Sequence, residues 1–385
     1  MIPLAYNVRS ILRRRFSATA TGLGLVVFVF AAVMMMGQGV STTLKSSGSP
    51  GNAILFRKGS TSELTSFLSR DAAKVLAADR AVAVEGGKPV ASPELFVIFQ
   101  LPRATGEGVA NVAFRGITMD GWQLLRSGSV KPGEGRLPRA GTSEVMIGRS
   151  VRGRYKGADL GQQIHIARRG WTVVGLFDAG GSAFESEIWT DADQLMDAAR
   201  RPGYSTMTVR LRSAADLGPL QTAADADRRF NLEAKREDVF YEEAAGPAAR
   251  FVTALGTLIA VFFAIGATLG AMITMYAQVA NRVREVGTLR ALGFGRRAVL
   301  GSFLVESLLL SLIGAGVGAL AAAALSNVSF SMTNFSSFTE IKFRLRFSSE
   351  IGIRAAIFAI AMGLLGGLAP AIRAARLQIA EAVKG

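Results

Sequence analysis

Few residues in this chain have side chains that could do chemistry. Glu306 is the one acid within a long apolar run, and His165 is the only histidine of the chain. A carboxylate inside a hydrocarbon layer is costly, so it requires a partner or a function. A single histidine does not make a metal site, so we interpret His165 as a structural residue of a predicted strand. The absence of cysteine excludes thiol catalysis, disulfide bonds and thiolate metal sites.

Three roles are open for Glu306. It could face a dimer interface, pair with an arginine of the basic strip at 278–297, or act as a proton or substrate ligand. The third role usually requires more polar residues in the apolar runs, and these runs offer almost none beyond serine, threonine and glutamine. A structural or coupling role is therefore favoured.

The sequence contains no catalytic constellation. The phosphate-cradling loop GxxxxGK[ST] does not occur, and neither do HExxH, GxSxG or an EF-hand loop. Asp191 and Asp193 follow a threonine at the start of a predicted helix, where carboxylates cap the helix and complement its dipole. We therefore expect no enzyme activity, no metal site and no cofactor in this chain.

Four stretches, 16–44, 251–281, 298–325 and 355–372, are long and apolar enough to cross a bilayer, which takes roughly 20 residues per helix. They carry no charge apart from Glu306. The first stretch is long and lacks a small-x-small cleavage site, which favours a retained anchor over a signal peptide. The expected organisation is a cytoplasmic interfacial helix (1–15), a first transmembrane helix (16–44), an extracytoplasmic domain (45–245), a stalk with the second transmembrane helix (246–278), a cytoplasmic coupling helix (279–297), a third transmembrane helix (298–325), a short external loop (326–350), a fourth transmembrane helix (351–371) and a cytoplasmic tail (372–385).

The net charge of +15 is concentrated beside these stretches. Residues 38–250 contain 28 Lys or Arg and 24 Asp or Glu, whereas the strips 1–15, 278–297 and 371–385 together contain 12 and two. Basic residues flank membrane spans on the cytoplasmic side. The pattern predicts a multi-pass membrane protein with both termini in the cytoplasm. Because the charge follows the spans, it argues against a nucleic-acid binder.

The segment 45–245 predicts a mixed α+β domain, with a β-rich subdomain at about 131–190. Helices are expected at 62–78, 191–200 and about 214–228. Strands are expected at 53–56, 94–101, 110–118, 144–148, 162–167, 171–177, 186–190, 206–212 and about 230–236.

The strip 279–297 predicts a basic amphipathic helix at the membrane surface. Apolar residues recur at helical spacing, arginines cover the rest of the surface, and Gly293 and Gly295 end the helix. The apolar positions are Val279, Val283, Val286, Leu289 and Leu292, and the arginines are Arg282, Arg284 and Arg290. The alternative is a connector that lies on lipid and needs only positive charge and apolar area.

The order R-x-R-E-V-G-x-L-R-A-L-G-x-x-R-R, followed by an apolar helix with the early acid Glu306, resembles the MacB/FtsX-like family of ABC transporter permeases. This resemblance implies four transmembrane helices plus a large α+β extracytoplasmic domain of the MacB periplasmic core type. It also implies that the strip is a coupling helix for an ATPase subunit. The residues expected to contact that subunit are Arg282, Arg284, Glu285, Val286, Leu289 and Arg290.

The same resemblance implies a function and partners. We expect a permease subunit of the bacterial inner membrane that couples ATP hydrolysis to motion of its external domain, for export or extraction of a substrate. ATP and magnesium would bind a separate ATPase subunit, and two permeases would form a homodimer surrounded by membrane lipid. A periplasmic adaptor protein is a further expected partner, and nucleic acid is not.

Three small-residue pairs recur in the apolar runs: Gly266 and Gly270, Gly314 and Gly318, and Gly363 and Gly367. Such spacing lets helices approach closely. The pairs therefore predict helix packing, with a dimer seam or merely glycine-rich helices as alternatives.

Two other functions stay open. The first is an FtsX-like regulator of extracytoplasmic cell-wall hydrolases that transports nothing, although an external domain of this size disfavours it. The second is a membrane-anchored sensor or adaptor that uses no ATP, although such a protein has no need for the coupling strip.

Overall fold

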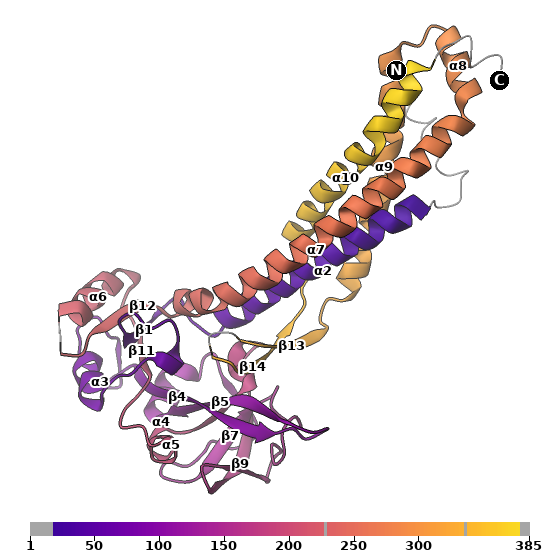
Figure 1. Cartoon of the computed structure of the whole chain (residues 1–385). Coiled ribbons are helices and arrows are strands. Elements are labelled where there is room, and N and C mark those ends of the chain that lie inside the picture. The colour runs from indigo at the N-terminus through magenta and orange to yellow at the C-terminus, as the bar shows by residue number, and fades with distance from the viewer. Residues whose placement is uncertain (1–17, 227–228, 335–336, 378–385) are drawn as a thin grey trace. The chain divides into compact units, whose positions relative to one another are not determined.

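The apolar runs of the sequence form four long helices. These helices are α2 (Ala18–Lys45), α7 (Glu237–Asn281), α9 (Arg296–Ala324) and α10 (Ser349–Arg376). Each contains a window that is long and apolar enough to cross a membrane, with a mean hydropathy between 2.0 and 2.2 (Figure 1).

The computed structural model describes residues 18–226, 229–334 and 337–377, so the expected interfacial helix at 1–15 lies outside the described residues. The chain divides into two units. The helical unit comprises Met1–Gln38, Phe251–Val328 and Leu345–Gly385, and the α/β unit comprises Gly39–Arg250 and Ser329–Arg344. We describe each unit separately.

The helical unit is built on close contacts between its long helices. Small residues permit this approach, since Ala264, Ala315 and Ala359 are at most 8% exposed in a core shared with leucine and valine side chains of α2. Phe30 of α2 stacks on Phe358 of α10, with ring centroids 4.6 Å apart. Dispersion contacts of this kind hold helices together where no hydrophobic driving force acts between them.

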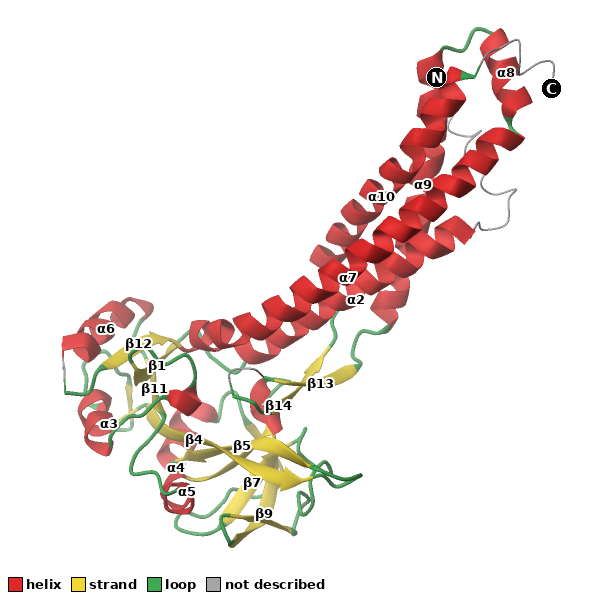
Figure 2. Ribbon diagram, viewed as in Figure 1, coloured by secondary structure: helices red, strands yellow, loops and turns green. Residues whose placement is uncertain are grey.

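The α/β unit contains one large mixed sheet (Figure 2). Its order is β12-β1-β11-β4-β5-β10-β7-β9-β6, and β8 pairs with β9. Two pairs, β5 with β10 and β7 with β9, are parallel. The strands are β1 (Asn52–Arg57), β4 (Ala91–Pro102), β5 (Val109–Ile117), β6 (Lys131–Gly135), β7 (Glu144–Gly148), β8 (Gln163–Ile166), β9 (Arg169–Asp178), β10 (Glu187–Asp191), β11 (Thr206–Arg210) and β12 (Leu232–Arg236). A small separate hairpin joins β2 (Val84–Glu85) to β3 (Lys88–Pro89).

Short helices cover parts of this sheet. α3 (Arg70–Ala77) and α6 (Leu217–Ala226) bury apolar side chains against β1 and β11, and α5 (Ala192–Ala199) packs on a second core around Trp171. The remaining short elements are α4 (Met119–Gly121), η1 (Glu63–Thr65), η2 (Trp122–Arg126), η3 (Ala183–Ser186) and η4 (Ala214–Asp216). The predicted α+β class is confirmed.

The helix predicted at 62–78 is shorter in the structure. It begins at Arg70 because Ser69 is extended and its hydroxyl accepts a hydrogen bond from the backbone N–H of Ala72. Leu68 lies before this cap and forms an isolated bridge with Tyr204. The apolar residues keep helical spacing on both sides of Ser69, so this spacing alone predicted a helix that starts too early.

The loop at 326–350 contains a hairpin that the sequence did not predict. β13 (Ser329–Thr333) pairs antiparallel with β14 (Glu340–Arg344). The hairpin belongs to the α/β unit, because Arg154 forms an ion pair with Glu340 at 2.6 Å and the backbone N–H of Lys342 donates to Ser186 at 3.1 Å. Arg103 also pairs with Glu340.

Candidate functional site

The basic strip folds as α8 (Val283–Ala291), a short helix between α7 and α9 in the helical unit (Figure 1). α7 ends at Asn281, and Arg282 has a non-helical backbone at φ −116° and ψ 18°. On the other side Gly293 adopts a φ of +94°, which favours glycine, and Gly295 caps α9. The backbone therefore makes α8 a separate element with its own orientation.

A buried ion pair joins the start of α8 to α9. Nη1 of Arg282 lies 2.7 Å from Oε2 of Glu306, and the two residues are 6% and 3% exposed. Of the three roles considered for Glu306, the structure shows contact with an arginine of the strip. Breaking such a pair leaves a buried charge without its partner, which is strongly unfavourable.

The apolar side of α8 is covered by this chain itself. Val286 is 3% exposed and packs with Val279, Val299, Phe303 and Ala371. The predicted contact of Val286 with an ATPase stays a prediction, and within this chain its side chain is already covered. The amphipathic pattern identified the face correctly, but the face is filled from within the helical unit.

Arg290 also turns toward this chain. Its Nη1 donates to the carbonyl oxygen of Leu377 at 2.5 Å, at the C-terminal end of α10. A helix leaves its last carbonyls without partners inside the helix, and an arginine can satisfy them. Arg282, Val286 and Arg290 therefore anchor α8 within this chain, and their contact with an ATPase subunit stays a prediction.

The opposite side of α8 is exposed. Arg284 is exposed, Leu289 is half-buried, and Leu292 has 72% of its surface accessible. The side chain of Glu285 is 57% exposed and its carboxylate lies 3.8 Å from Nε of Arg282. We name Arg284, Glu285, Leu289 and Leu292 the outer face of α8. It combines charges of both signs with apolar surface.

Two of the three glycine pairs pack helices within the chain. A Cβ on Gly318 would lie 2.3 Å from the carbonyl oxygen of Gly24, and one on Gly314 would lie 2.7 Å from that of Ala20. A Cβ on Gly363 or Gly367 would meet α9 serine side chains at 2.3 to 2.5 Å. Glycine therefore sets the distances from α9 to α2 and to α10.

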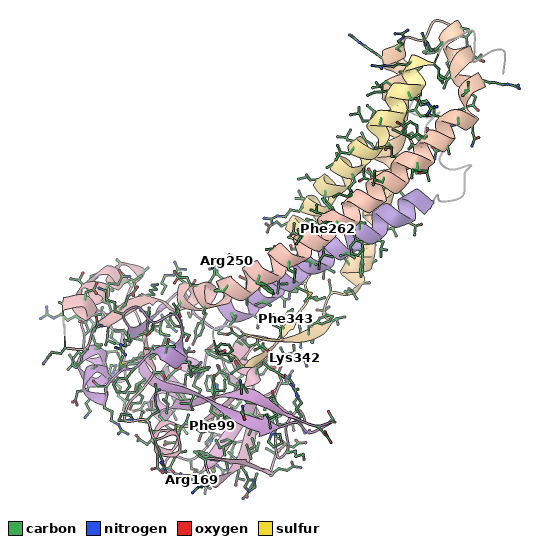
Figure 3. All side chains as sticks on the ribbon, in the orientation of Figure 1. Phe99, Arg169, Arg250, Phe262, Lys342 and Phe343 are labelled. Atoms are coloured by element: carbon green, nitrogen blue, oxygen red, sulfur yellow. The ribbon has the colours of Figure 1, made fainter. Side chains whose placement is uncertain are left out.

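The third pair lies on an open surface. A Cβ on Gly266 or Gly270 would meet no described residue within 4 Å, and both glycines are exposed on α7. Their neighbours Phe262 and Ile273 are 67% and 69% exposed. Figure 3 labels Phe262 on α7. Only 22% of the most apolar window of α7 is buried, against 44% for each of the other three long helices.

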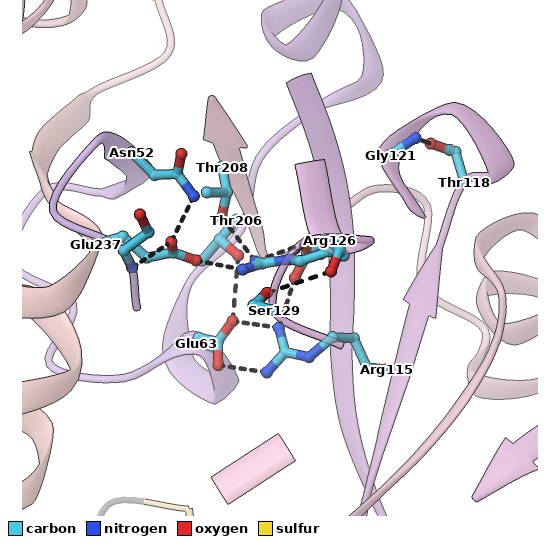
Figure 4. A network of polar contacts seen from close by, with 12 residues as sticks. Asn52, Glu63, Arg115, Thr118, Gly121, Arg126, Ser129, Thr206, Thr208 and Glu237 are labelled. Atoms are coloured by element: carbon cyan, nitrogen blue, oxygen red, sulfur yellow. Dashed lines mark hydrogen bonds and ion pairs between the residues drawn. The ribbon is translucent and has the colours of Figure 1, made fainter. Parts of the chain in front are cut away.

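Residues that the sequence reasoning missed form a buried charge network in the α/β unit (Figure 4). Arg115 is 0% exposed and contacts Glu63, Glu94 and Glu187, while Arg126 contacts Glu94 and Glu237. Glu94 and Arg115 lie within the apolar strand runs at 94–101 and 110–118, and such charges in an apolar run could have indicated buried ion pairs. Strand alternation alone assigns such residues to a solvated face.

Smaller predictions have mixed outcomes. Asp191 caps α5 by accepting a hydrogen bond from the backbone N–H of Gln194 at 3.0 Å, which confirms its capping role. Asp193 lies in the first turn and pairs with Arg70 at 2.6 Å. His165 lies on β8 with an exposed side chain. Within the described ranges, no group of three or more His, Cys, Asp or Glu could hold a metal ion.

The chain matches two family models. The model described as MacB-like periplasmic core domain matches residues 16–227, which is more than half of the chain. The model described as FtsX-like permease C-terminal matches residues 257–379, which contain α8 and Glu306.

The chain is similar to two individual relatives and to one solved domain. The uncharacterized ABC transporter permease YknZ of Bacillus subtilis (strain 168) is 24% identical, over 99% of this chain and 99% of that protein. The macrolide export ATP-binding/permease protein MacB of Neisseria gonorrhoeae is 24% identical over 98% of this chain, which covers 60% of that protein. The crystal structure of the extracellular domain of YknZ has a TM-score of 0.37 and 14% identity, covering 48% of this chain and 99% of that domain.

The described residues thus contain four apolar helices, an α/β unit, and a short helix between the second and third apolar helices. The same chain matches both family models. The chain belongs to the MacB/FtsX-like family of ABC transporter permeases.

Proposed function

We propose that this permease couples ATP hydrolysis by a separate ATPase subunit to motion of its α/β unit, and thereby exports or extracts a substrate. ATP and magnesium would bind the ATPase, because this sequence has no phosphate-cradling loop. The outer face of α8 would be the surface that receives the movement of the ATPase.

One observation carries this proposal: α8 is fixed on one side and exposed on the other. Arg282 binds Glu306 of α9, Val286 packs among α7, α9 and α10, and Arg290 binds the end of α10. A force on the outer face is therefore passed to the long helices instead of bending a free loop. A connector that merely lies on lipid does not require these three attachments.

The proposal includes a location and an orientation. The basic strips beside the spans favour the bacterial inner membrane, with both termini and α8 in the cytoplasm and the α/β unit outside. In that position the α/β unit would be available to a periplasmic adaptor protein.

We further propose a homodimer that forms through the exposed face of α7. Gly266 and Gly270 leave room for a second helix, and Phe262 is exposed beside them. The chain has no cysteine, so Phe262→Cys provides a single thiol. Oxidation in native membranes should yield a disulfide-linked dimer, and Ile357→Cys on α10, 62% exposed, is the control. Equal cross-linking at both positions would argue against this seam.

The coupling role is tested by reversing one charge of the outer face. Glu285→Lys keeps α8 amphipathic and makes it more basic, so a lipid-lying connector should tolerate it. A docking helix should lose co-purification of the ATPase by about tenfold or more, because a docked charge pair becomes a repulsion. Leu292→Asp should have the same effect through the apolar part of the face.

The matched control is Glu350→Lys. Glu350 lies near the start of α10, and its side chain is 57% exposed, as is that of Glu285. It should retain the ATPase and its stimulation. Normal complex formation and transport in both Glu285→Lys and Leu292→Asp would end the coupling hypothesis for α8.

A further inference from the structure

The buried network of the α/β unit contains more negative than positive charge. Two guanidinium groups, Arg115 and Arg126, directly contact four carboxylates. All six residues are at most 6% exposed. The carboxylates belong to Glu63, Glu94, Glu187 and Glu237. If every group is ionised, the network has two negative charges without a counter-charge.

N–H donors contact all four carboxylates, although burial raises the pKa of Glu187 above its ordinary value. Each of the eight carboxylate oxygens accepts at least one N–H, from Arg115, Arg126, the Asn52 side chain or the Ser49 backbone. Glu187 additionally accepts Nε1–H of Trp189 at 2.7 Å. A protonated carboxyl would need an acceptor for its own hydrogen, and these contacts supply donors. Uncompensated charge in a dry core is strongly unfavourable, so the network favours either a positive group or a proton on one carboxylate.

A small cavity adjoins the negative side of this network. Its volume is about 40 Å³, and its wall includes Glu63 and Glu187, whose side chains are 7% and 8% exposed. Three phenylalanines, Phe96, Phe184 and Phe240, also line it. Carboxylates together with aromatic rings form the environment that cationic organic groups prefer.

Tyr241 supplies an independent indication of a ligand. It lines the same cavity, is 5% exposed, and its hydroxyl is buried with no hydrogen-bond partner among the described residues. Buried hydroxyls are almost always paired. Burial raises the pKa of Tyr241 well above its ordinary value, so the hydroxyl stays neutral and offers a free lone pair to a donor.

We propose that this cavity binds the ammonium group of a ligand that carries a primary amine. The ammonium would donate to the Tyr241 hydroxyl and to the cavity-facing carboxylates of Glu63 and Glu187, and would lie against the aromatic rings. An anion is excluded by the excess negative charge. A metal ion is not favoured, since no group of three metal-ligating side chains occurs among the described residues.

The position of the cavity gives such a ligand access to the elements that lead into the long helices. Leu44 belongs to the last turn of α2, and Tyr241 belongs to the first turns of α7. Thr339 and Ile341 come from the segment around β14. Binding itself requires neither ATP nor the ATPase, so its test is separate from that of the coupling role.

The test is a titration of the full chain in detergent with methylammonium chloride, against potassium chloride at equal concentration. Trp189 donates to Glu187, so tryptophan fluorescence reports on the site. A ligand of two heavy atoms should saturate with a Kd on the order of millimolar. Potassium chloride should produce no saturable change.

Tyr241→Phe is the decisive variant. It removes a hydroxyl without a partner in the folded chain, so folding should be unaffected, while the Kd for methylammonium should rise about tenfold. Tyr155→Phe, at a buried tyrosine outside the cavity, is the matched control and should leave the Kd unchanged. Glu63→Gln should abolish saturation, with thermal unfolding measured to confirm that it folds.

Three results would overturn the proposal. The first is an equal response to potassium and methylammonium, which would indicate ionic strength or a simple metal cation. The second is a fluorescence change that follows pH alone, which would show that protons neutralise the network. The third is the same methylammonium Kd in wild type and in Tyr241→Phe.

Discussion

The guanidinium of Arg282 and the carboxylate of Glu306 are 2.7 Å apart, and this contact attaches α8 to α9 inside the helical unit. The residues are 24 positions apart in sequence, and both are almost fully buried. The pair therefore depends on the packing of the two helices.

Removing one member of this pair should destabilise the permease. Glu306→Gln leaves the Arg282 charge buried, at a cost of about 3–5 kcal/mol. We expect a lower thermal unfolding temperature in detergent and loss of ATPase stimulation. The double variant Arg282→Glu with Glu306→Arg should restore part of the thermal stability and part of the ATPase stimulation.

The control is an exposed ion pair. Glu350→Gln removes the pair with Arg354 and should cost less than about 1 kcal/mol. Equal effects of Glu306→Gln and Glu350→Gln would contradict the structural role of the buried pair.

The two kinds of glycine should respond differently to alanine. Gly318→Ala places a Cβ against the Gly24 backbone, which must move, so we expect a loss of about 1–3 kcal/mol. Gly301→Ala, on the same helix, meets nothing within 4 Å among the described residues and should be neutral or slightly stabilising, because alanine is the better helix former. Thermal unfolding of the two variants in the same detergent measures the difference. If Gly318→Ala were as stable as wild type, the close contact of α9 with α2 would be refuted.

The α/β unit should lose stability in acid. Hydrogen bonds from the Arg136 side chain and the Arg139 backbone lower the pKa of Glu144 from about 4.5 to about 2. The unfolded chain therefore binds this proton at a higher pH than the folded chain does. The stabilisation is complete above about pH 4.5 and is lost as the pH falls through about 2.

Urea unfolding followed by tryptophan fluorescence measures this effect, because Trp122, Trp171 and Trp189 all lie in the α/β unit. Glu144→Gln should reduce the slope of unfolding free energy against pH between 2 and 4.5. Glu107→Gln, at an exposed acid of the β4–β5 turn, should leave it unchanged. A slope that Glu144→Gln does not alter would assign the acid sensitivity to other carboxylates.

The proposed orientation predicts opposite labelling of two exposed positions. The chain is free of cysteine, so Glu107→Cys and Arg297→Cys each introduce one thiol. In spheroplasts an impermeant maleimide should label position 107 directly and position 297 only after permeabilisation. Direct labelling of both positions would place α8 and the α/β unit on the same side and refute the four-span topology.

Much of the fold could be predicted because long apolar runs and strand alternation are local signals. The expected strands at 94–101 and 110–118 are found as β4 and β5, within three residues at each end. The hairpin of β13 and β14 escaped prediction, since its aromatic residues gave no clear alternation and its position depends on contacts with Arg103 and Arg154.

The site was predictable in part. Helical spacing showed that Val279 and Val286 share a face, but it could not show that Phe303 and Ala371 cover this face from the same chain. The buried network was out of reach for a similar reason. Arg115 meets carboxylates 21 to 72 positions away, and only the folded sheet brings them together.

The cavity beside Tyr241 has a thermodynamic consequence for the whole permease. Its wall contains Leu44 from the end of α2 and Tyr241 from the beginning of α7, so its shape depends on how these two residues pack inside the α/β unit. Any ligand that prefers one cavity shape must favour the helix positions that create it, and by linkage a change in those positions must alter the affinity by the same factor. Under the proposed coupling role, occupancy of the cavity and the positions of α2 and α7 would therefore depend on one another.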